Sequence, residues 1–439
     1  MRAYLWLIYV IVCGGLLSAC GTTSSVNIPS TDTPTPPTLE TDPTESNQFV
    51  VWGQSDLTLS IDNYIKSLFE AQHPEIDVIF VDAGWDEALR QNFENAIQMG
   101  RPPEIVIGEN YFRTFAADGK LQAVDSVLAQ YDDLIPPTYA GAIYEEQVYA
   151  VPYLTGIFAF ERNCDVIESA GLNCDDVPQY WDELLADAQA ITEAGAGDYY
   201  GYTLQGPGGT AVGSAFRIAV YQAQVGGLPC ADDACTVPNF NRAESIPVYQ
   251  FLRDLVQNNP PGLLENTHEG EVYEALFRGV SAYQIAGSWH PEWAQISGCD
   301  NCRYSSIPYP RDGQSATLLV GNVLYAAPTN SQHPELALEW LELLLSDEVQ
   351  SRIFAETGRF PVRTSALTDL LAEADDVTGI FVDRLLNSEN VYILPQWGQN
   401  PRATWEIYND LLYTLLTTDQ PIDDLMAQAQ TQVETLYAE

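Results

Sequence analysis

Aromatic rings and carboxylates recur together where three successive apolar segments of the chain end. Flat aromatic rings can stack on the apolar C–H faces of a pyranose, and carboxylates or amides can bond to the hydroxyl groups along its edge. One such combination is unremarkable in an acidic sequence, but three in succession indicate a surface for a hydroxyl-rich ring. The candidate binding residues at these three positions are Trp52, Asp82, Trp85, Asp86, Glu109, Asn110 and Tyr111.

Each of these residues also has a purely structural interpretation, which the sequence leaves open. Trp52 can pack on the helix that follows it. Asp86 can cap the start of a helix, and Glu109 and Asn110 can belong to a turn. Three other tryptophans lie in the apolar stripes of predicted helices and are interpreted as core residues: Trp181, Trp340 and Trp405.

The elements that position the candidate residues follow the alternating pattern of a parallel sheet. Short apolar strands are predicted at 49–53, 76–81 and 104–107, separated by helices at 57–68 and 87–99. This βαβαβ order is typical of a parallel sheet covered by helices, in which ligands bind at the carboxyl ends of the strands. The pattern continues with strands at 149–153, 157–160 and 282–286, and with helices from Pro178 and at 337–345, 404–416 and 422–436.

The charge of the chain restricts its partners. The 439 residues include 61 acidic and 18 basic residues, which gives a formal net charge of −43. This charge repels nucleic acid and anionic lipid headgroups, so both are excluded as partners. A strongly anionic ligand is disfavoured as well, unless a local arginine pocket overrides the global charge. Most of the acidic residues are interpreted as an adaptation for solubility.

The start of the chain has the composition of an export signal. A charged start at residues 1–2 is followed by an almost wholly apolar segment, 3–16, and by small residues before Cys20. This order is typical of a secretory signal, and the apolar segment is shorter than the about 20 residues of a membrane span. Leu17–Cys20 resembles the lipobox of bacterial lipoproteins, which implies removal of residues 1–19 and lipidation of Cys20. The alternative is an ordinary cleaved signal with a coincidental cysteine.

The segment after Cys20 separates the signal from the folded region. Residues 20–48 consist mainly of Thr, Ser and Pro with a few acids. Such a composition cannot form a core and predicts a disordered tether. About 390 residues remain beyond it, which exceeds what a single core usually holds, so two domains or lobes are expected.

Six cysteines remain after Cys13 in the signal and Cys20 are set aside. An even number of cysteines in an exported chain indicates disulfides, and pairing between near neighbours is the simplest arrangement. Cys299 and Cys302 could instead form a redox pair or half of a zinc site, but no second Cys-x-x-Cys accompanies them. No metal and no cofactor is predicted. The expected disulfides are Cys164–Cys174, Cys230–Cys235 and Cys299–Cys302.

Short motifs containing Gly, Pro and Trp follow one another along the folded region. They are Gly100–Val106, Ala117–Asp125, Tyr149–Tyr153, Phe160–Asn163, Ala170–Leu184, Leu276–Trp289, His333–Gln350 and Thr357–Pro361. Their order resembles that of the extracellular solute-binding proteins of carbohydrate ABC importers, the maltose-binding-protein-like group. Glu104 departs from the pattern, since the family usually has aspartate there. Each motif is weak alone, but their order over the whole folded region is specific.

The resemblance implies an α/β fold with two lobes, a periplasmic-binding-protein-like fold of the class II type. Each lobe is expected to be a mixed β-sheet flanked by helices, and a hinge joins the two. By analogy, lobe one comprises residues 50–157 and 321–366, and lobe two comprises 158–320 and 367–439. The ligand is expected in the cleft between the lobes, with closure about the hinge.

The resemblance also implies ligand contacts outside the first three strand ends. Trp289 is the foremost of these, because the matching tryptophan of the family commonly stacks on sugar. Arg359 in the Thr-Gly-x-x-Pro motif and Arg363 just after it are interpreted as bracing a turn. The further candidate ligand contacts are Tyr153 and Asn322 near the two crossings between the lobes, Trp289, and Trp397 and Arg402 in a late loop.

The implied function is that of a receptor without enzymatic activity. Such a lipoprotein is anchored to the cell membrane by its lipid, captures a mono- or oligosaccharide as a monomer, and delivers it to the permease subunits of an ABC importer. One alternative is an exported binder of another solute, such as a polyamine or a peptide. Another is a secreted glycoside hydrolase, which requires two carboxylates at a defined separation. With 61 acidic residues some pair always fits, so this signal is not specific.

Overall fold

The computed structural model describes residues 47–438, except for 54, 85, 109–111, 208–212, 233–234, 266–268 and 399. The predicted signal peptide, Cys20 and nearly all of the tether therefore lie outside the described residues. Several candidate binding residues also fall in these gaps and are named with the site below.

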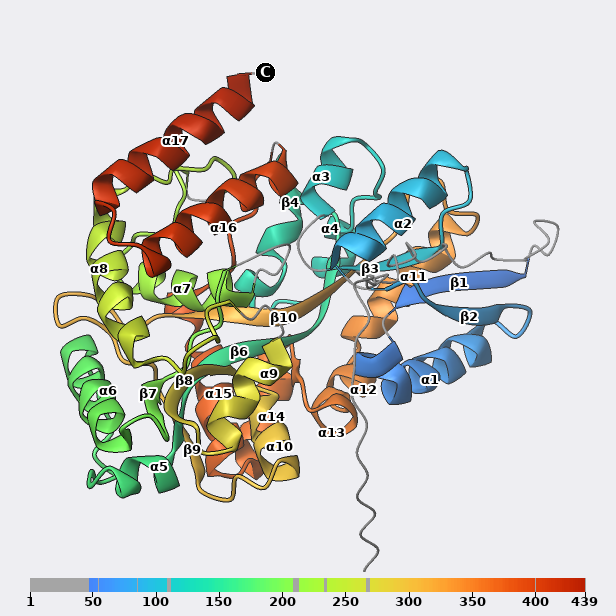
Figure 1. The fold of residues 1–439 in the computed structure, drawn as a ribbon. Helices are drawn as coiled ribbons and strands as arrows, with labels where there is room; N and C mark the ends of the chain where they lie inside the picture. Colours follow the sequence, from blue (N-terminus) through green and yellow to red (C-terminus); the bar gives the residue numbers. More distant parts are fainter. Residues whose placement is uncertain are drawn as a thin grey trace, which may run out of the picture. The chain divides into compact units, whose positions relative to one another are not determined.

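The strands form one ten-stranded mixed sheet and a separate hairpin of β4 with β5 (Figure 1). The order of the large sheet is β2-β1-β3-β10-β6-β8-β7, with β9 and β11 also paired to β6 and β12 paired to β10. The strands are β1 (Gln48–Gly53), β2 (Asp77–Asp82), β3 (Ile105–Gly108), β4 (Ile143–Tyr144), β5 (Gln147–Val148), β6 (Val151–Asn163), β7 (Tyr200–Tyr202), β8 (Ser281–Gly287), β9 (Cys302–Ser305), β10 (Thr317–Ala326), β11 (Phe360–Pro361) and β12 (Val391–Tyr392).

The first five elements confirm the predicted βαβαβ unit. β1 pairs in parallel with both β2 and β3, and α1 (Ser55–Gln72) and α2 (Asp86–Gln98) connect these strands. The strand boundaries lie within one residue of the predicted ones, because buried apolar segments end abruptly at polar or glycine residues.

The remaining helices follow the apolar periodicity of the sequence. Those predicted from Pro178, at 337–345, at 404–416 and at 422–436 are confirmed as α6 (Trp181–Gly195), α11 (Pro334–Leu345), α16 (Pro401–Thr417) and α17 (Ile422–Ala438). The others are α3 (Phe112–Ala117), α4 (Asp125–Leu128), α5 (Cys164–Ser169), α7 (Gly213–Gln224), α8 (Ile246–Leu255), α9 (Glu269–Phe277), α10 (His290–Ile296), α12 (Asp347–Gln350), α13 (Ile353–Thr357), α14 (Thr364–Glu373) and α15 (Asp376–Leu386). Short 3₁₀ turns include η1 (Pro136–Thr138) and η2 (Ala140–Ala142). None of the helices in the described ranges combines the length and apolar character needed to cross a bilayer.

Two long strands, β6 and β10, run antiparallel through the centre of the sheet (Figure 1). The sequence predicts two strands at 149–153 and 157–160, but the structure has one strand of 13 residues with every residue buried. The sequence also predicts a separate sheet in each lobe. In the structure these two sheets are continuous, because β6 and β10 contribute to both of them. Val320 and Val323 flank an irregularity in their pairing, where Gly321 has a φ of +57°. We call the paired residues 156–157 and 319–320 the crossing.

Apolar side chains cover both faces of the sheet around the crossing. Phe158 and Val320 belong to a cluster that includes α7, α8, α16 and α17, whereas Ile157 and Leu319 belong to a second cluster with α14 and α15. Alternate residues of β6 therefore point into different cores, which explains why this strand lacks the polar alternation of a strand with one solvated face.

The three expected disulfides are present in the structure. They link Cys164 to Cys174, Cys230 to Cys235 and Cys299 to Cys302, over sequence separations of 10, 5 and 3 residues. The second bridge closes the loop before α8, and the third closes the turn between α10 and β9.

The carboxylate of Asp133 joins the segment before η1 to the start of α14. Arg363 Nε donates to its two oxygens at 2.9 and 3.2 Å, and the Ser365 N–H donates at 3.3 Å, which confirms that Arg363 braces this turn. Burial acts to raise the pKa of Asp133, but these donors outweigh it, so the pKa lies below its ordinary value. The carboxylate therefore stabilises the fold above the unfolded pKa of about 3.9, and this contribution is lost as the pH falls through the lower folded pKa.

We expect Asp133→Asn to lower the free energy of unfolding by about 1.5–3 kcal/mol at pH 7, the usual range for hydrogen bonds to a charged group. The difference from the wild type should shrink as the pH falls below about 4, because the wild-type carboxyl then becomes protonated. Urea unfolding at pH 7 and pH 3 measures both values. An equal difference at the two pH values would contradict the assignment.

Candidate functional site

The carboxyl ends of strands from both sides of the sheet meet at the crossing. Gly108 at the end of β3 pairs with Leu324, a few residues from the crossing along β10. Gly287 at the end of β8 pairs with Phe158, next to the crossing on β6. Because ligands of open α/β sheets bind at the carboxyl ends of strands, this convergence marks the candidate site.

Trp289 lies at the centre of this region, directly after β8, and its side chain is partly exposed. Its indole ring lies close to three glycines. A Cβ added to Gly287 would come within 2.4 Å of ring carbons, and one added to Gly156 or Gly321 would lie 3.6 or 3.7 Å from Cζ3. The ring can approach the backbone of the crossing this closely because these glycines have no side chain. Gly321 also has the positive φ that favours glycine.

A guanidinium group covers one side of the same ring. Arg359 Cζ lies 4.3 Å from the centroid of the Trp289 ring, which is a cation–π contact. Arg359 belongs to the turn between α13 and β11, where the sequence predicts only a bracing role for it. The sequence gives no sign of the contact, because the two residues are 70 positions apart.

A small cavity adjoins the crossing. The volume that the centre of a water molecule can occupy in it is about 20 Å³. This is enough for roughly one water and too little for a sugar. The side chain of Asn322 reaches it, and its Nδ2 donates to the carbonyl of Thr138 at 2.7 Å. The residues that line this cavity are Gly141, Phe216, Leu319, Asn322, Ile393, Leu394 and Gln396.

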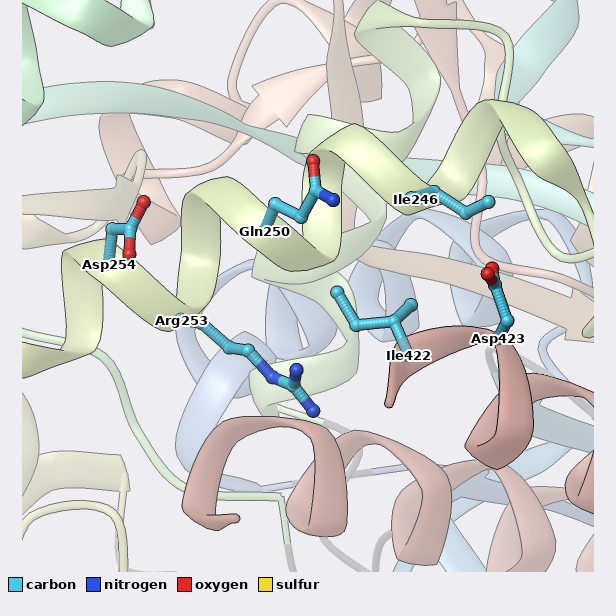
Figure 2. Close-up of a pocket in the computed structure, with 6 residues that line it drawn as sticks. All are labelled: Ile246, Gln250, Arg253, Asp254, Ile422 and Asp423. Carbon is cyan, nitrogen blue, oxygen red and sulfur yellow. The ribbon is translucent and has the colours of Figure 1, made fainter. Parts of the chain in front are cut away.

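A larger cavity of about 500 Å³ lies elsewhere, between α8 and the start of α17 (Figure 2). Arg253, which lines this cavity, already binds the backbone. Its Nε donates to the Leu415 carbonyl at 2.7 Å and its Nη2 to the Gln420 carbonyl at 2.6 Å. No strand ends at this cavity within the described residues. The crossing therefore remains the better candidate despite its smaller cavity.

Three predicted ligand contacts are core residues in this structure. Trp52 is 4% exposed and packs edge-on against Phe93 of α2, and Trp397 is 3% exposed among other aromatic rings. Tyr153 is fully buried, and burial raises the pKa of its hydroxyl well above the ordinary value. Their side chains present almost no surface to a ligand in this conformation, so their assignment as ligand contacts stays a prediction.

The other predicted contacts lie at the surface or outside the described residues. Asp82 is exposed and accepts a hydrogen bond from the Gly84 N–H at 3.0 Å. Arg402 is exposed on α16 and forms an ion pair with Glu406 at 3.2 Å. Trp85, Glu109, Asn110 and Tyr111 lie outside the described residues, and of Asp86 only the backbone, which begins α2, is described.

A buried polar network lies next to Trp289 and includes the following residue, His290. The sequence does not predict this network. Glu161 of β6 is fully buried and bonded to three side chains. It accepts from Gln284 Nε2 at 2.7 Å and from the Tyr304 hydroxyl at 2.5 Å, and it lies 2.9 Å from His290 Nδ1. Burial, and then the charge of Glu161, raises the pKa of Tyr304, so this hydroxyl keeps its proton and donates it. The network fixes the first residue of α10, which follows Trp289.

Two known binding proteins are similar to this chain in sequence. A putative binding protein of Brucella abortus is 30% identical over 145 residues, 32% of this chain and 34% of that protein. The match thus spans about a third of the length of this curated relative. An uncharacterized ABC transporter extracellular-binding protein of Pyrococcus horikoshii is 21% identical and covers 89% of this chain and 88% of its own.

Among solved structures, the sugar-binding protein MalE of Xanthomonas citri is similar in fold. The TM-score is 0.75 at 19% identity, over 89% of this chain and 97% of that one. Residues 54–351 match the bacterial extracellular solute-binding protein family. This match covers more than half of the chain and spans the strand ends, the crossing and Trp289, so the chain belongs to the bacterial extracellular solute-binding proteins.

Proposed function

We propose that this protein is the substrate-binding lipoprotein of an ABC importer and that it captures a mono- or oligosaccharide in a cleft between two lobes. Trp289 carries the proposal, because it places a partly exposed aromatic ring where strand ends from both sides of the sheet converge. Family membership and the descriptions of the P. horikoshii and X. citri proteins support it. The protein binds its ligand and alters no bond.

In this proposal the crossing acts as the hinge between the two lobes. In the proposed division, lobe one comprises residues 50–157 and 321–366, and lobe two comprises 158–320 and 367–439. Trp289 then belongs to lobe two and Arg359 to lobe one, and their cation–π contact bridges the lobes. A ligand shifts the balance between open and closed forms only through contacts that are better in the closed form.

The export and anchoring of the protein belong to the same proposal. Residues 1–19 are removed, Cys20 carries the lipid, and residues 20–48 hold the folded region away from the membrane. The protein acts as a monomer and passes its sugar to the permease subunits. Mass spectrometry of the membrane fraction tests the anchor, since the N-terminal peptide should begin at a Cys20 heavier by its acyl chains, and Cys20→Ser should abolish this species.

Ligand binding is tested with the purified protein and a panel of mono- and oligosaccharides. Because Trp289 is partly exposed at the hinge, a bound sugar should change the tryptophan fluorescence and reduce the radius of gyration in small-angle X-ray scattering. Amino acids, short peptides and polyamines serve as controls. If no sugar produces either change, or if a control solute produces both, the proposed ligand class is wrong.

A further inference from the structure

Arg113 on α3 has a half-buried side chain, and within the described ranges its guanidinium has no hydrogen-bond or ion-pair partner. The other basic side chains of the described residues bind carboxylates, hydroxyls, backbone carbonyls or aromatic rings, with the exception of Arg101, which is exposed. In a chain with 61 acidic residues against 18 basic ones, a lack of counter-charges does not explain this isolation. Arg113 is therefore the one half-buried lysine or arginine side chain in the described part of the chain that lacks a partner.

The position of Arg113 places it beside the candidate site. α3 follows β3, whose carboxyl end meets the crossing, and it packs against η2 and β4. Gly141 of η2 lines the small cavity together with Gln396. The Gln396 N–H donates to the Cys235 carbonyl at 3.0 Å, so Cys235 lies next to a residue that lines that cavity.

Asp232 on this loop attracts Arg113 electrostatically but does not bond to it. Its carboxylate is already occupied, since it accepts from the Thr236 N–H at 2.9 Å, the Val237 N–H at 2.7 Å and Thr236 Oγ1 at 2.8 Å. Burial acts to raise the pKa of Asp232, but these donors outweigh it and lower the pKa, so the carboxylate stays ionised. The half-burial of Arg113 removes part of its hydration and lowers its pKa.

A half-buried charge without a partner is unfavourable, and a ligand that supplies the opposite charge removes this cost. The five N–H donors of a guanidinium form a planar fork that fits a carboxylate with two parallel hydrogen bonds. A phosphate carries nearly two negative charges, and the ionised Asp232 nearby disfavours the second one. The single cation thus suits a ligand with one negative charge.

We propose that Arg113 binds the ligand and that the ligand is a carbohydrate bearing a carboxylate, of the uronic acid class. This inference rests on the proposed function and narrows its substrate class. The net charge of −43 does not prevent such binding. Interactions between exposed charges are screened beyond about 8 Å at physiological salt, whereas a contact within a cleft is screened much less.

The experiment compares ligands by calorimetry at 150 mM salt (about the physiological value) with the full mature protein. The probes are galacturonate, glucuronate and their short oligomers, the corresponding neutral sugars, and glucose 6-phosphate. We expect a uronate to bind at least about 10-fold more tightly than its neutral counterpart, the scale of one charged hydrogen bond. Arg113→Gln should weaken the uronate about 10- to 100-fold and change neutral sugars less than about 3-fold, and Arg113→Lys should recover only part of the loss.

Arg101→Gln is the matched control, because it removes the same charge from the exposed position before β3 and should leave all affinities unchanged. The inference is overturned if uronates bind no better than neutral sugars, if glucose 6-phosphate binds best, or if Arg113→Gln behaves as the wild type. Neutral sugars that still bind show that the variant is folded and that the proposed function holds. If no sugar of either kind binds the wild type, the proposed function fails, and this inference with it.

Discussion

Replacing Glu161 with alanine is expected to destabilise the protein by about 3–5 kcal/mol, the usual cost of removing one partner from a buried polar pair. Glu161 is fully buried, and its register neighbours on either side, Gln284 of β8 and Tyr304 of β9, both donate to it. Without the carboxylate these donors and His290 remain buried without an acceptor. Since a whole domain is stable by about 5–15 kcal/mol, a large part of the stability is at stake.

Chemical denaturation followed by circular dichroism measures the loss of stability. Two milder variants show which hydrogen bonds of the network contribute to it. Glu161→Gln retains one acceptor oxygen and should recover part of the stability. Tyr304→Phe removes a single donor without leaving the carboxylate unbonded, so it should cost about 1–2 kcal/mol. If Glu161→Ala is no more damaging than Tyr304→Phe, Glu161 is not the centre of this network.

Replacing Trp289 with alanine is expected to weaken sugar binding about 30- to 1,000-fold, or about 2–4 kcal/mol, the range for a central aromatic residue of a binding site. The variant removes the ring between the crossing and the ligand, and it also leaves Arg359 without its aromatic contact. Titration calorimetry with a sugar that binds the wild type gives the loss directly.

Two further variants separate the ring from its surroundings. Gly287→Ala keeps the indole but places a Cβ 2.4 Å from its carbons, so the ring must move and affinity should fall as well. Arg359→Gln removes the cation–π contact, worth about 0.5–2 kcal/mol, but keeps the indole ring, so it should weaken binding much less. Unchanged affinity in both Trp289→Ala and Gly287→Ala would show that the ligand binds elsewhere.

Much of the fold follows from local patterns in the sequence. Apolar strands that end at Gly53, Asp82 and Gly108 give the parallel unit its boundaries. β1 and β3 are largely buried, which leaves continuous apolar runs, whereas β2 at the edge of the sheet is mostly half-buried. The single strand β6 does not follow in this way. Pro152 and Gly156 resemble strand breakers, and pairing with β10 and β11, both more than 150 residues away, holds them in one extended segment.

The candidate site is less accessible to sequence reasoning for a related reason. Trp52, Trp289 and Trp397 all lie near the end of an apolar segment, yet Trp52 and Trp397 are enclosed by the core and Trp289 remains partly exposed. The three glycines near the Trp289 ring come from three separate strands, and the guanidinium beside it comes from a distant turn. The sequence does not predict a binding role for Arg113, because its lack of a partner depends on the folded chain and not on its sequence neighbours.

The spacing of the three disulfides has a consequence for oxidation of the chain during the proposed export. If cysteines oxidise in the order in which they leave an export channel, Cys164 meets Cys174 first, then Cys230 meets Cys235, and Cys299 meets Cys302 last. Each partner emerges at most 10 residues later, and loops of this size close in about 10–100 ns. Under that order of oxidation each cysteine meets its native partner before the next pair is exposed, so the native pairing forms without any mispaired thiols for a disulfide isomerase to correct.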